Sequence, residues 1–224
     1  MCLIKIQQMK ILIIVLIIQI VTIQSVQASE KNKWRLIKNE NEIRVYIYES
    51  KSNDIVKAKA RTIVNFPINT IKLIIDDISH RHEWVPYLKN SKALSIYKNN
   101  KRIEYSHFSA PWPASDRDFV YQIELISESN KQLVYKMRSI ESSLMPENNY
   151  RIRAELYESI YTLTALNKET TVVDLVFHAD PKGWLPNWII NIIQRVLPYK
   201  ILKNLKSRLK LQLKTKKMKD NKKD

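Results

Sequence analysis

Residues 186–213, PNWIINIIQRVLPYKILKNLKSRLKLQL, predict one long helix near the end of the chain. Pro186 favours a helix start, because its fixed φ suits the first turn. A helix that continues to about Leu213 would be roughly 40 Å long at ~1.5 Å per residue. Its first half is apolar over a wide arc, and its second half narrows to leucines among lysines. Pro198 lacks the amide hydrogen of a regular helix, so we expect a kink between the halves.

The segments before this helix have the patterns of antiparallel strands. From Val56 to Val64, apolar or small side chains alternate with cations, as in a strand with one buried face. Short polar linkers favour hairpins and an antiparallel meander. We also predict a short helix at Trp34–Lys38 and a helix opened by Pro67. The predicted strands are Ile43–Tyr48, Val56–Val64, Ala93–Tyr97, Ile103–Ala110, Phe119–Leu125, Leu133–Ile140, Tyr150–Leu166 and Thr171–His178.

Four groups of motifs follow one another along the chain. They are WVP at 84–86, APWPASDRDFV at 110–120, HADPKGWLPNW at 178–188, and LPY at 197–199 with LKNL at 202–205. In order and spacing these motifs resemble the START domain family, in its bacterial branch. The likeness extends from Trp34 to about Leu209, and PWPASDRDFV is its most specific part.

This resemblance implies an α+β helix-grip fold, in which a curved antiparallel sheet wraps around a long C-terminal helix and encloses a hydrophobic tunnel for one lipid. Members of the family bind sterols, phospholipids or ceramides, and usually carry them rather than transform them. The residue patterns agree, because antiparallel strands, an apolar-faced terminal helix and the lack of a catalytic constellation are typical of a container.

Two charged positions have alternative interpretations. Arg117 either faces the tunnel, with a ligand headgroup or a carboxylate as partner, or forms a structural ion pair with Asp118 that fixes the turn. Glu104 lies thirteen residues before Arg117, where steroid-carrying relatives have an acidic residue facing the cavity. Those relatives also have an arginine where this chain has Ile123. We therefore expect the internal ion pair to be broken, and Glu104 either faces the cavity or lies at the surface.

Apolar candidates complete the predicted site. Trp112, Trp184 and Trp188 either line the tunnel or belong to the core. Leu144 and Met145 resemble the family's gate, and the alternative is an ordinary loop that buries two side chains. The predicted ligand-binding residues are Trp84, Glu104, Trp112, Arg117, Phe119, Leu144, Met145, Trp184, Trp188 and Ile192.

Composition excludes several classes of enzyme. Gly183 is the only glycine, whereas phosphate-binding loops, dinucleotide turns and serine hydrolase elbows need several. The acidic and histidine side chains between Asp76 and Glu83 fit no metal spacing, so we interpret them as a solvated helix end. We predict no catalytic residue, no metal and no cofactor.

Residues 1–28 have the features of an export signal. Lys5 and Lys10 precede an apolar run, and Val26-Gln27-Ala28 has the small-residue spacing that signal peptidase reads. The run is shorter than the ~20 residues of a comfortable membrane span. We expect a periplasmic or secreted protein, and the alternative is an uncleaved anchor that tethers it to the membrane. Cleavage would remove Cys2, the only cysteine, and with it any disulfide or thiolate site.

Charge is concentrated after the predicted domain. The formal net charge is +16, and losing Lys5 and Lys10 lowers it to +14. After Leu205 the sequence contains nine cationic and two acidic residues, a net charge of +7. We predict a domain at 29–213, a basic disordered tail at 214–224 that docks on an anionic membrane surface, and a monomer. Nucleic acid is excluded as a partner by the predicted export.

Two functions of different classes remain. The first is a non-enzymatic exported protein that holds one sterol-like lipid, phospholipid or fatty acyl lipid in its tunnel, for transfer or sensing. The second is a helix-grip enzyme of cyclase/aromatase type that acts on a hydrophobic substrate. We favour the first, because export would separate the chain from the cytoplasmic partners of such enzymes.

Overall fold

The computed structural model describes residues 34–48, 55, 57–97 and 100–220, so the predicted export signal lies outside the described residues. The helices are α2 (Ile68–Asp76), the 3-10 helix η1 (Arg81–Glu83), α3 (Asn187–Asn191), the π-helical η2 (Ile192–Val196) and α4 (Leu197–Asp220). The strands are β1 (Trp34–Glu40), β2 (Ile43–Tyr48), β3 (Ala58–Val64), β4 (Leu88–Tyr97), β5 (Lys101–Phe108), β6 (Arg117–Glu128), β7 (Gln132–Ser139), β8 (Ile152–Arg153), β9 (Glu155–Ala165) and β10 (Thr171–Asp180).

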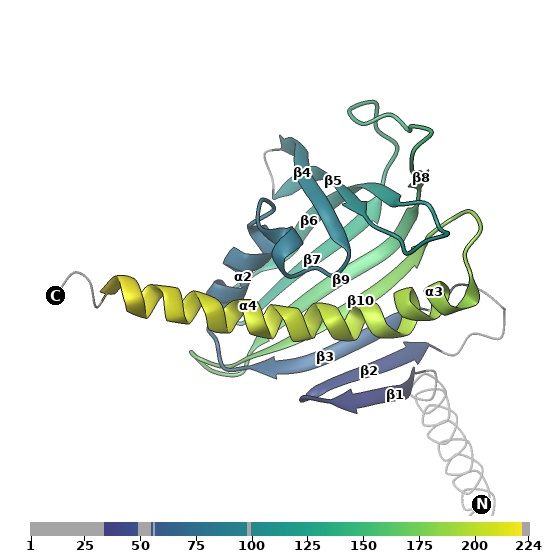
Figure 1. Ribbon diagram of the computed structural model, residues 1–224. Helices are drawn as coiled ribbons and strands as arrows, with labels where there is room; N and C mark the ends of the chain where they lie inside the picture. Colours follow the sequence, from purple (N-terminus) through teal and green to yellow (C-terminus); the bar gives the residue numbers. More distant parts are fainter. Residues whose placement is uncertain (1–33, 49–54, 56, 98–99, 221–224) are drawn as a thin grey trace, which may run out of the picture.

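The strands of this described part form one ten-stranded sheet in the order β1-β2-β3-β10-β9-β7-β6-β5-β4, with β8 beside β6. All pairs are antiparallel except β6 with β8. The sheet curves around the C-terminal helix, which crosses its open face (Figure 1). The predicted helix-grip fold is thus confirmed.

The N-terminal hairpin corrects one prediction. The segment that begins at Trp34 is strand β1, not a short helix. Asn41 and Glu42 both have positive φ, 51° and 60°, as in the two-residue turns that match the twist of paired strands. The turn brings Trp34 opposite Tyr48, where their rings meet edge to face at 5.4 Å. Cross-strand pairing therefore outweighs the local helical pattern.

The C-terminal helix begins after Pro186, as predicted, and continues to Asp220. Residues 214–220 of the predicted tail are therefore helical. Near Pro198, where we expect a kink, the helix contains the π-helical η2, which directly precedes α4. Pro198 cannot donate a hydrogen bond to the preceding turn, and a wider turn there absorbs the missing bond.

The core lies between the concave face of the sheet, α2 and the C-terminal helix. Leu202, Leu205 and Leu209 are fully buried there, as the leucine spacing predicts. A second, smaller cluster of Ile103, Tyr105 and Val120 lies apart from this core. Within the described ranges, the helices are too short or too polar to cross a bilayer.

Candidate functional site

A cavity separates part of the C-terminal helix from the sheet. It contains about 1270 Å³ of space, including a part that is open to solvent. The sheet contributes side chains of β5, β6, β7, β9 and β10, and α2 with the segment after it closes another side. The helix contributes Ile189, Ile192, Ile193, Leu197 and Ile201, so most of the wall is apolar.

Four of the predicted ligand-binding residues line this cavity: Trp84, Arg117, Phe119 and Ile192. Trp84 is buried where the chain leaves η1, and Phe119 projects inward from β6. The structure thus brings together residues that are up to 108 positions apart in the sequence. Their contact with a ligand stays a prediction.

Part of the cavity wall is polar because it contains the buried side chains of Arg81, Ser106 and Tyr121, and we call this part the deep end. Arg81 Nη1 donates to the Glu104 carboxylate and, at 3.1 Å, to Tyr121 Oη. Its Nη2 donates to the Ile75 carbonyl at 2.9 Å. Tyr121 Oη also donates to Glu104 Oε2 at 2.8 Å and lies 2.9 Å from Ser106 Oγ. The guanidinium and the carboxylate are therefore both enclosed and both hydrogen-bonded.

Glu104 corrects the expectation of a broken ion pair. It is fully buried behind the cavity wall, with Arg81 and Arg102 both donating to its carboxylate. Burial alone would raise the pKa of Glu104, but the two guanidiniums outweigh it and hold the pKa below its usual value. Ile123, where the steroid-carrying relatives have arginine, is itself buried. The ion pair forms from a different position of the chain.

Arg81 is the functional residue that the sequence analysis missed. It lies within the stretch Asp76–Glu83, which was interpreted as a solvated helix end. Only its neighbours fit that interpretation, since Asp77 pairs with His80 at the surface. The described residues hold no group of three metal-ligating side chains. A carboxylate buried at Glu104 requires a cation nearby, and the sequence offers Arg81 as the first arginine after α2.

Arg102 also belongs to the ion pairs around Glu104. Its strand, β5, lies between β4 and β6, and its side chain is partly buried. Besides Glu104, it donates to Asp76 of α2 at 3.2 Å. Asp76 in turn accepts from Lys72 at 2.9 Å and from Tyr135 Oη at 3.1 Å. The ion pairs thus continue from the cavity to α2.

Two further hydroxyl groups face the cavity from β9. Ser159 and Tyr161 are two residues apart, so they project from the same face of the strand. No described residue forms a hydrogen bond with Ser159 Oγ or Tyr161 Oη. Burial raises the pKa of Tyr161, so its phenol keeps its proton at neutral pH.

Arg117 is buried, but it forms no ion pair with Asp118. Its guanidinium donates to the carbonyls of Pro181, Lys182 and Trp184 at 3.1–3.2 Å, and to the Ser115 carbonyl. The arginine therefore ties the turn before β6 to the segment between β10 and α3. Neither of the two interpretations of Arg117 predicted these carbonyl partners. Asp118 instead accepts from Arg153 Nε at 2.7 Å.

The only glycine of the chain, Gly183, lies in the turn after β10, where the backbone requires it. Its φ is +62°, a conformation that side chains with a Cβ rarely adopt. A Cβ at this position would lie 2.8 Å from Ile152 Cδ1 and 3.9 Å from Arg117 Nη2. The glycine thus lets the 181–184 segment approach Arg117 closely.

The family is decided by the match to its model. The START domain model matches residues 22–215. The chain belongs to the START domain family. An uncharacterized protein of Pseudomonas aeruginosa is 22% identical over 174 residues, which cover 78% of this chain and 85% of that protein. This likeness supports the bacterial branch that the motifs indicated.

Two further comparisons extend beyond bacteria. The phosphatidylcholine transfer protein of Rattus norvegicus is 24% identical over 162 residues, covering 70% of this chain and 75% of the relative. The crystal structure of human STARD10 is similar with a TM-score of 0.75 and 19% identity, covering 83% of this chain and 76% of that chain. At this identity the structural likeness shows the fold of the START domain.

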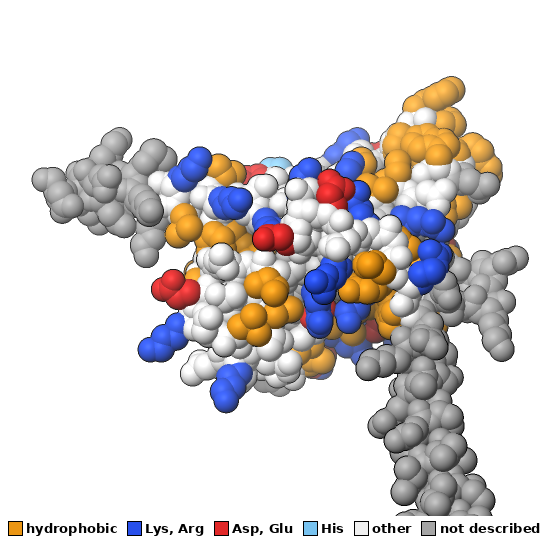
Figure 2. Space-filling model, turned by 90° about the horizontal axis from the view of Figure 1, so that it is seen from below, with side chains coloured by type: hydrophobic (Ala, Val, Ile, Leu, Met, Phe, Trp, Pro, Cys, Tyr) orange, Lys and Arg blue, Asp and Glu red, His pale blue; other side chains and the backbone are white. Residues whose placement is uncertain are grey.

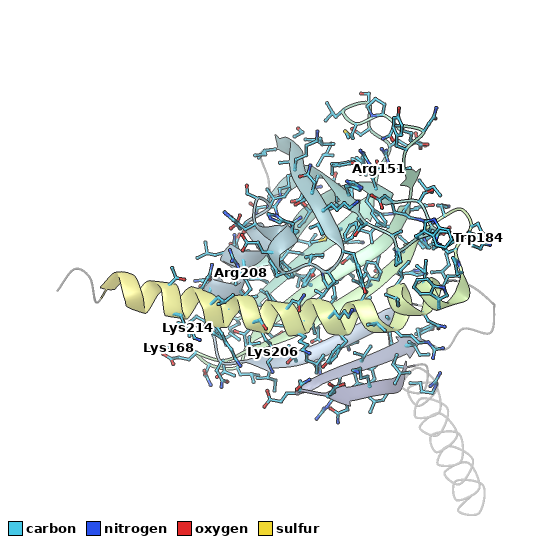
Figure 3. The ribbon with its side chains drawn as sticks, viewed as in Figure 1. Arg151, Lys168, Trp184, Lys206, Arg208 and Lys214 are labelled. Carbon is cyan, nitrogen blue, oxygen red and sulfur yellow. The ribbon has the colours of Figure 1, made fainter. Side chains whose placement is uncertain are left out.

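Three tryptophans do not line the cavity of this START domain, contrary to the expectation that they face the tunnel or the core. Trp112 is 89% exposed and Trp184 is 69% exposed, while Trp188 is half-exposed. Trp188 precedes the inward-facing Ile189, and one helical residue turns the side chain about 100° away. Trp184 points outward at the right-hand end of Figure 3. Figure 2 shows hydrophobic side chains gathered at this same end.

The loop between β7 and β8 does not reach the cavity wall either. Leu144 is exposed, and Met145 packs against the second cluster formed by Ile103, Tyr105 and Val120. These side chains project from β5 and β6 on the face opposite to Glu104 and Tyr121, because side chains alternate along a strand. Of the two side chains that an ordinary loop was expected to bury, the structure therefore packs Met145 and leaves Leu144 exposed.

Proposed function

We propose that this START domain is a non-enzymatic lipid-binding protein that holds one hydrophobic ligand in its cavity, for transfer or sensing. The observation that carries the proposal is the apolar space between the sheet and the C-terminal helix. The name of the rat relative, a phosphatidylcholine transfer protein, supports the same class of function.

The physical basis of binding is the removal of apolar ligand surface from water. Each 100 Å² of such surface contributes about 2.5 kcal/mol when it is buried. Side chains such as Ile189, Leu197 and Phe177 offer dispersion contacts to an acyl chain or ring system. A water-soluble metabolite would leave most of this wall without a favourable partner.

We propose carriage over catalysis because of the chemistry of the cavity wall. Its titratable side chains among the described residues are arginines and tyrosines, with no carboxylate or imidazole. Burial raises the pKa of Tyr121 and Tyr161 above the ordinary tyrosine value. Neither phenol is thus a good general base near pH 7. The cyclase/aromatase alternative would need a base that reaches into the cavity.

We propose further that the protein is exported as a monomer and that cleavage after Ala28 releases it into the periplasm or beyond. The support is the sequence pattern of residues 1–28, which lie outside the described residues. An uncleaved segment would instead tether the START domain to the membrane.

We also propose that the cationic end of α4 docks on an anionic membrane. Lys210 and Lys214 are exposed there, and each contributes about 1 kcal/mol near an anionic surface. Figure 3 shows Lys214 at the end of the molecule opposite to Trp184. Docking by this end therefore leaves the tryptophan-bearing end free to face elsewhere.

The test of lipid binding compares two neighbouring residues of α3. Ile189 is buried at the cavity wall, whereas Trp188 is half-exposed. We expect Ile189→Asp to abolish retention of a fluorescent sterol by the delipidated protein, because an uncompensated carboxylate in an apolar site costs several kcal/mol. Trp188→Asp is the matched control and should retain the probe.

Circular dichroism of both variants separates lost binding from lost folding. If Ile189→Asp does not fold, competition on the wild type decides, because apolar lipids should displace the probe and water-soluble metabolites should not. A folded Ile189→Asp variant with undiminished retention would overturn the proposal.

A further inference from the structure

We infer that the polar end of the bound lipid is uncharged and that Ser159 and Tyr161 hold it at the deep end of the cavity. The ligand class is a neutral lipid that ends in a hydroxyl or carbonyl group, such as a diacylglycerol, a sterol or a long-chain alcohol. This inference rests on the proposed function and names the ligand of that same cavity.

The first step is the charge balance of the deep end. Arg81, the only cation among the described residues of the wall there, already pairs with Glu104. The connected group contains three cations and three carboxylates. Its net charge is therefore zero, and a phosphate would find no uncompensated cation. The members are Lys72, Arg81 and Arg102 with Asp76, Glu104 and Glu128.

The second step concerns Arg117, the other arginine of the wall. Its guanidinium donates to four backbone carbonyls, which lie at Ser115, Pro181, Lys182 and Trp184. Binding a phosphate there would break the bonds that join the 181–184 segment to the start of β6. Both arginines are thus committed to the protein itself.

The third step is the set of polar atoms that remain for a ligand. Ser159 Oγ and Tyr161 Oη border the cavity and form no hydrogen bond with any residue in the described part of the chain. A neutral hydroxyl donates and accepts, so this pair suits an alcohol or an ester carbonyl. An anion would have to be desolvated beside two uncharged groups, which is far more costly than desolvating an alcohol.

The experiment uses two lipids with identical acyl chains. Dioleoylglycerol and dioleoyl phosphatidic acid are presented separately to the delipidated full-length protein from cyclodextrin complexes, and retained lipid is measured by mass spectrometry. We expect dioleoylglycerol to bind at least ten times more tightly. Equal or tighter binding of phosphatidic acid would overturn the inference while leaving lipid binding intact. Retention of neither lipid would instead count against the proposed function.

Two variants assign the preference to named residues. Tyr161→Phe removes one hydroxyl, and we expect about a fivefold loss of dioleoylglycerol affinity, the value of one ordinary hydrogen bond. Tyr157→Phe is the matched control on the same strand, because Tyr157 Oη contacts Asp180 and does not line the cavity. Equal affinity of Tyr161→Phe and wild type would overturn the assignment.

Glu104→Gln tests the charge balance, because it gives the deep end a net positive charge. It removes one negative charge and leaves Arg81 and Arg102 with one fewer carboxylate between them. We expect the ratio of phosphatidic acid to dioleoylglycerol binding to rise at least fivefold. An unchanged ratio in a folded variant would contradict the charge balance. If this variant does not fold, the wild-type lipid pair and Tyr161→Phe decide the matter.

Discussion

The ion pair of Arg81 and Glu104 makes the sharpest prediction about stability. Arg81→Met keeps most of the side-chain volume but removes a buried cation from a fully buried carboxylate. Breaking such a pair on one side costs about 3–5 kcal/mol. Glu104 keeps Arg102 and Tyr121 as donors, so we expect the lower end, about 3 kcal/mol. Urea unfolding at pH 7 measures this loss, provided that the slope of the unfolding free energy against urea concentration is the same in variant and wild type.

The loss should depend on pH with a defined sign. In the wild type the folded pKa of Glu104 is lowered, so its stabilisation is present above the ordinary value of 4.5 and disappears as pH falls through the folded pKa. In Arg81→Met, only the Arg102 guanidinium opposes the effect of burial, so the pKa of Glu104 rises. The carboxyl then takes up a proton at higher pH, which relieves the penalty. The difference between variant and wild type should therefore be smaller near pH 4 than at pH 7.

Two controls make this prediction specific. Arg81→Met/Glu104→Leu removes both charges and should recover at least half of the lost stability. Arg61→Met breaks an ion pair with Asp174 in which the arginine is half-exposed, and should cost less than about 1 kcal/mol. The reasoning is refuted if Arg81→Met costs no more than Arg61→Met, or if the double variant is no more stable than Arg81→Met alone.

Three further predictions test other parts of the structure. Trp84→Ala should lower the free energy of unfolding by about 3 kcal/mol in thermal unfolding, because Trp84 is buried. Trp112 is highly exposed, so Trp112→Ala should change that free energy by no more than about 0.5 kcal/mol, and equal losses would contradict these positions. Burial opposes ionisation of Asp116, but hydrogen bonds from Lys89, the Ala110 amide and His107 lower its pKa to about 2. Wild-type stability should therefore fall as pH drops from 3.8 towards 2, and Asp116→Asn should lack this part of the acid titration. Lys210→Gln with Lys214→Gln should weaken flotation with anionic liposomes without changing lipid retention, and a wild type that ignores liposome charge would refute the docking proposal.

The sequence predicted the parts of the fold that depend on strong periodicity. Alternation identified β3, and helical spacing identified the long terminal helix with Leu202, Leu205 and Leu209 inward. Strand β1 was missed because the turn at Asn41 and Glu42, and not the residue pattern of β1 itself, determines that it pairs with β2. Pairing across a hairpin is not encoded in one segment alone.

The site was predictable only where a residue's environment follows from its own element. Phe119 and Ile192 were placed correctly, since strand and helix periodicity determine which way they face. Arg81 was missed because its partner, Glu104, is 23 residues away and meets it only in the folded sheet. Trp112 was misjudged because a large apolar side chain in an irregular loop has no period that fixes its direction.

Native mass spectrometry of the protein purified from its own host tests the lipid-binding function most directly. We predict a complex of one chain with one lipid. The released lipid should be uncharged and largely hydrophobic, with a hydroxyl or ester group at its polar end. A chain that carries no lipid when purified and takes up none from a lipid extract, or one that holds only a water-soluble metabolite, would contradict the proposed function.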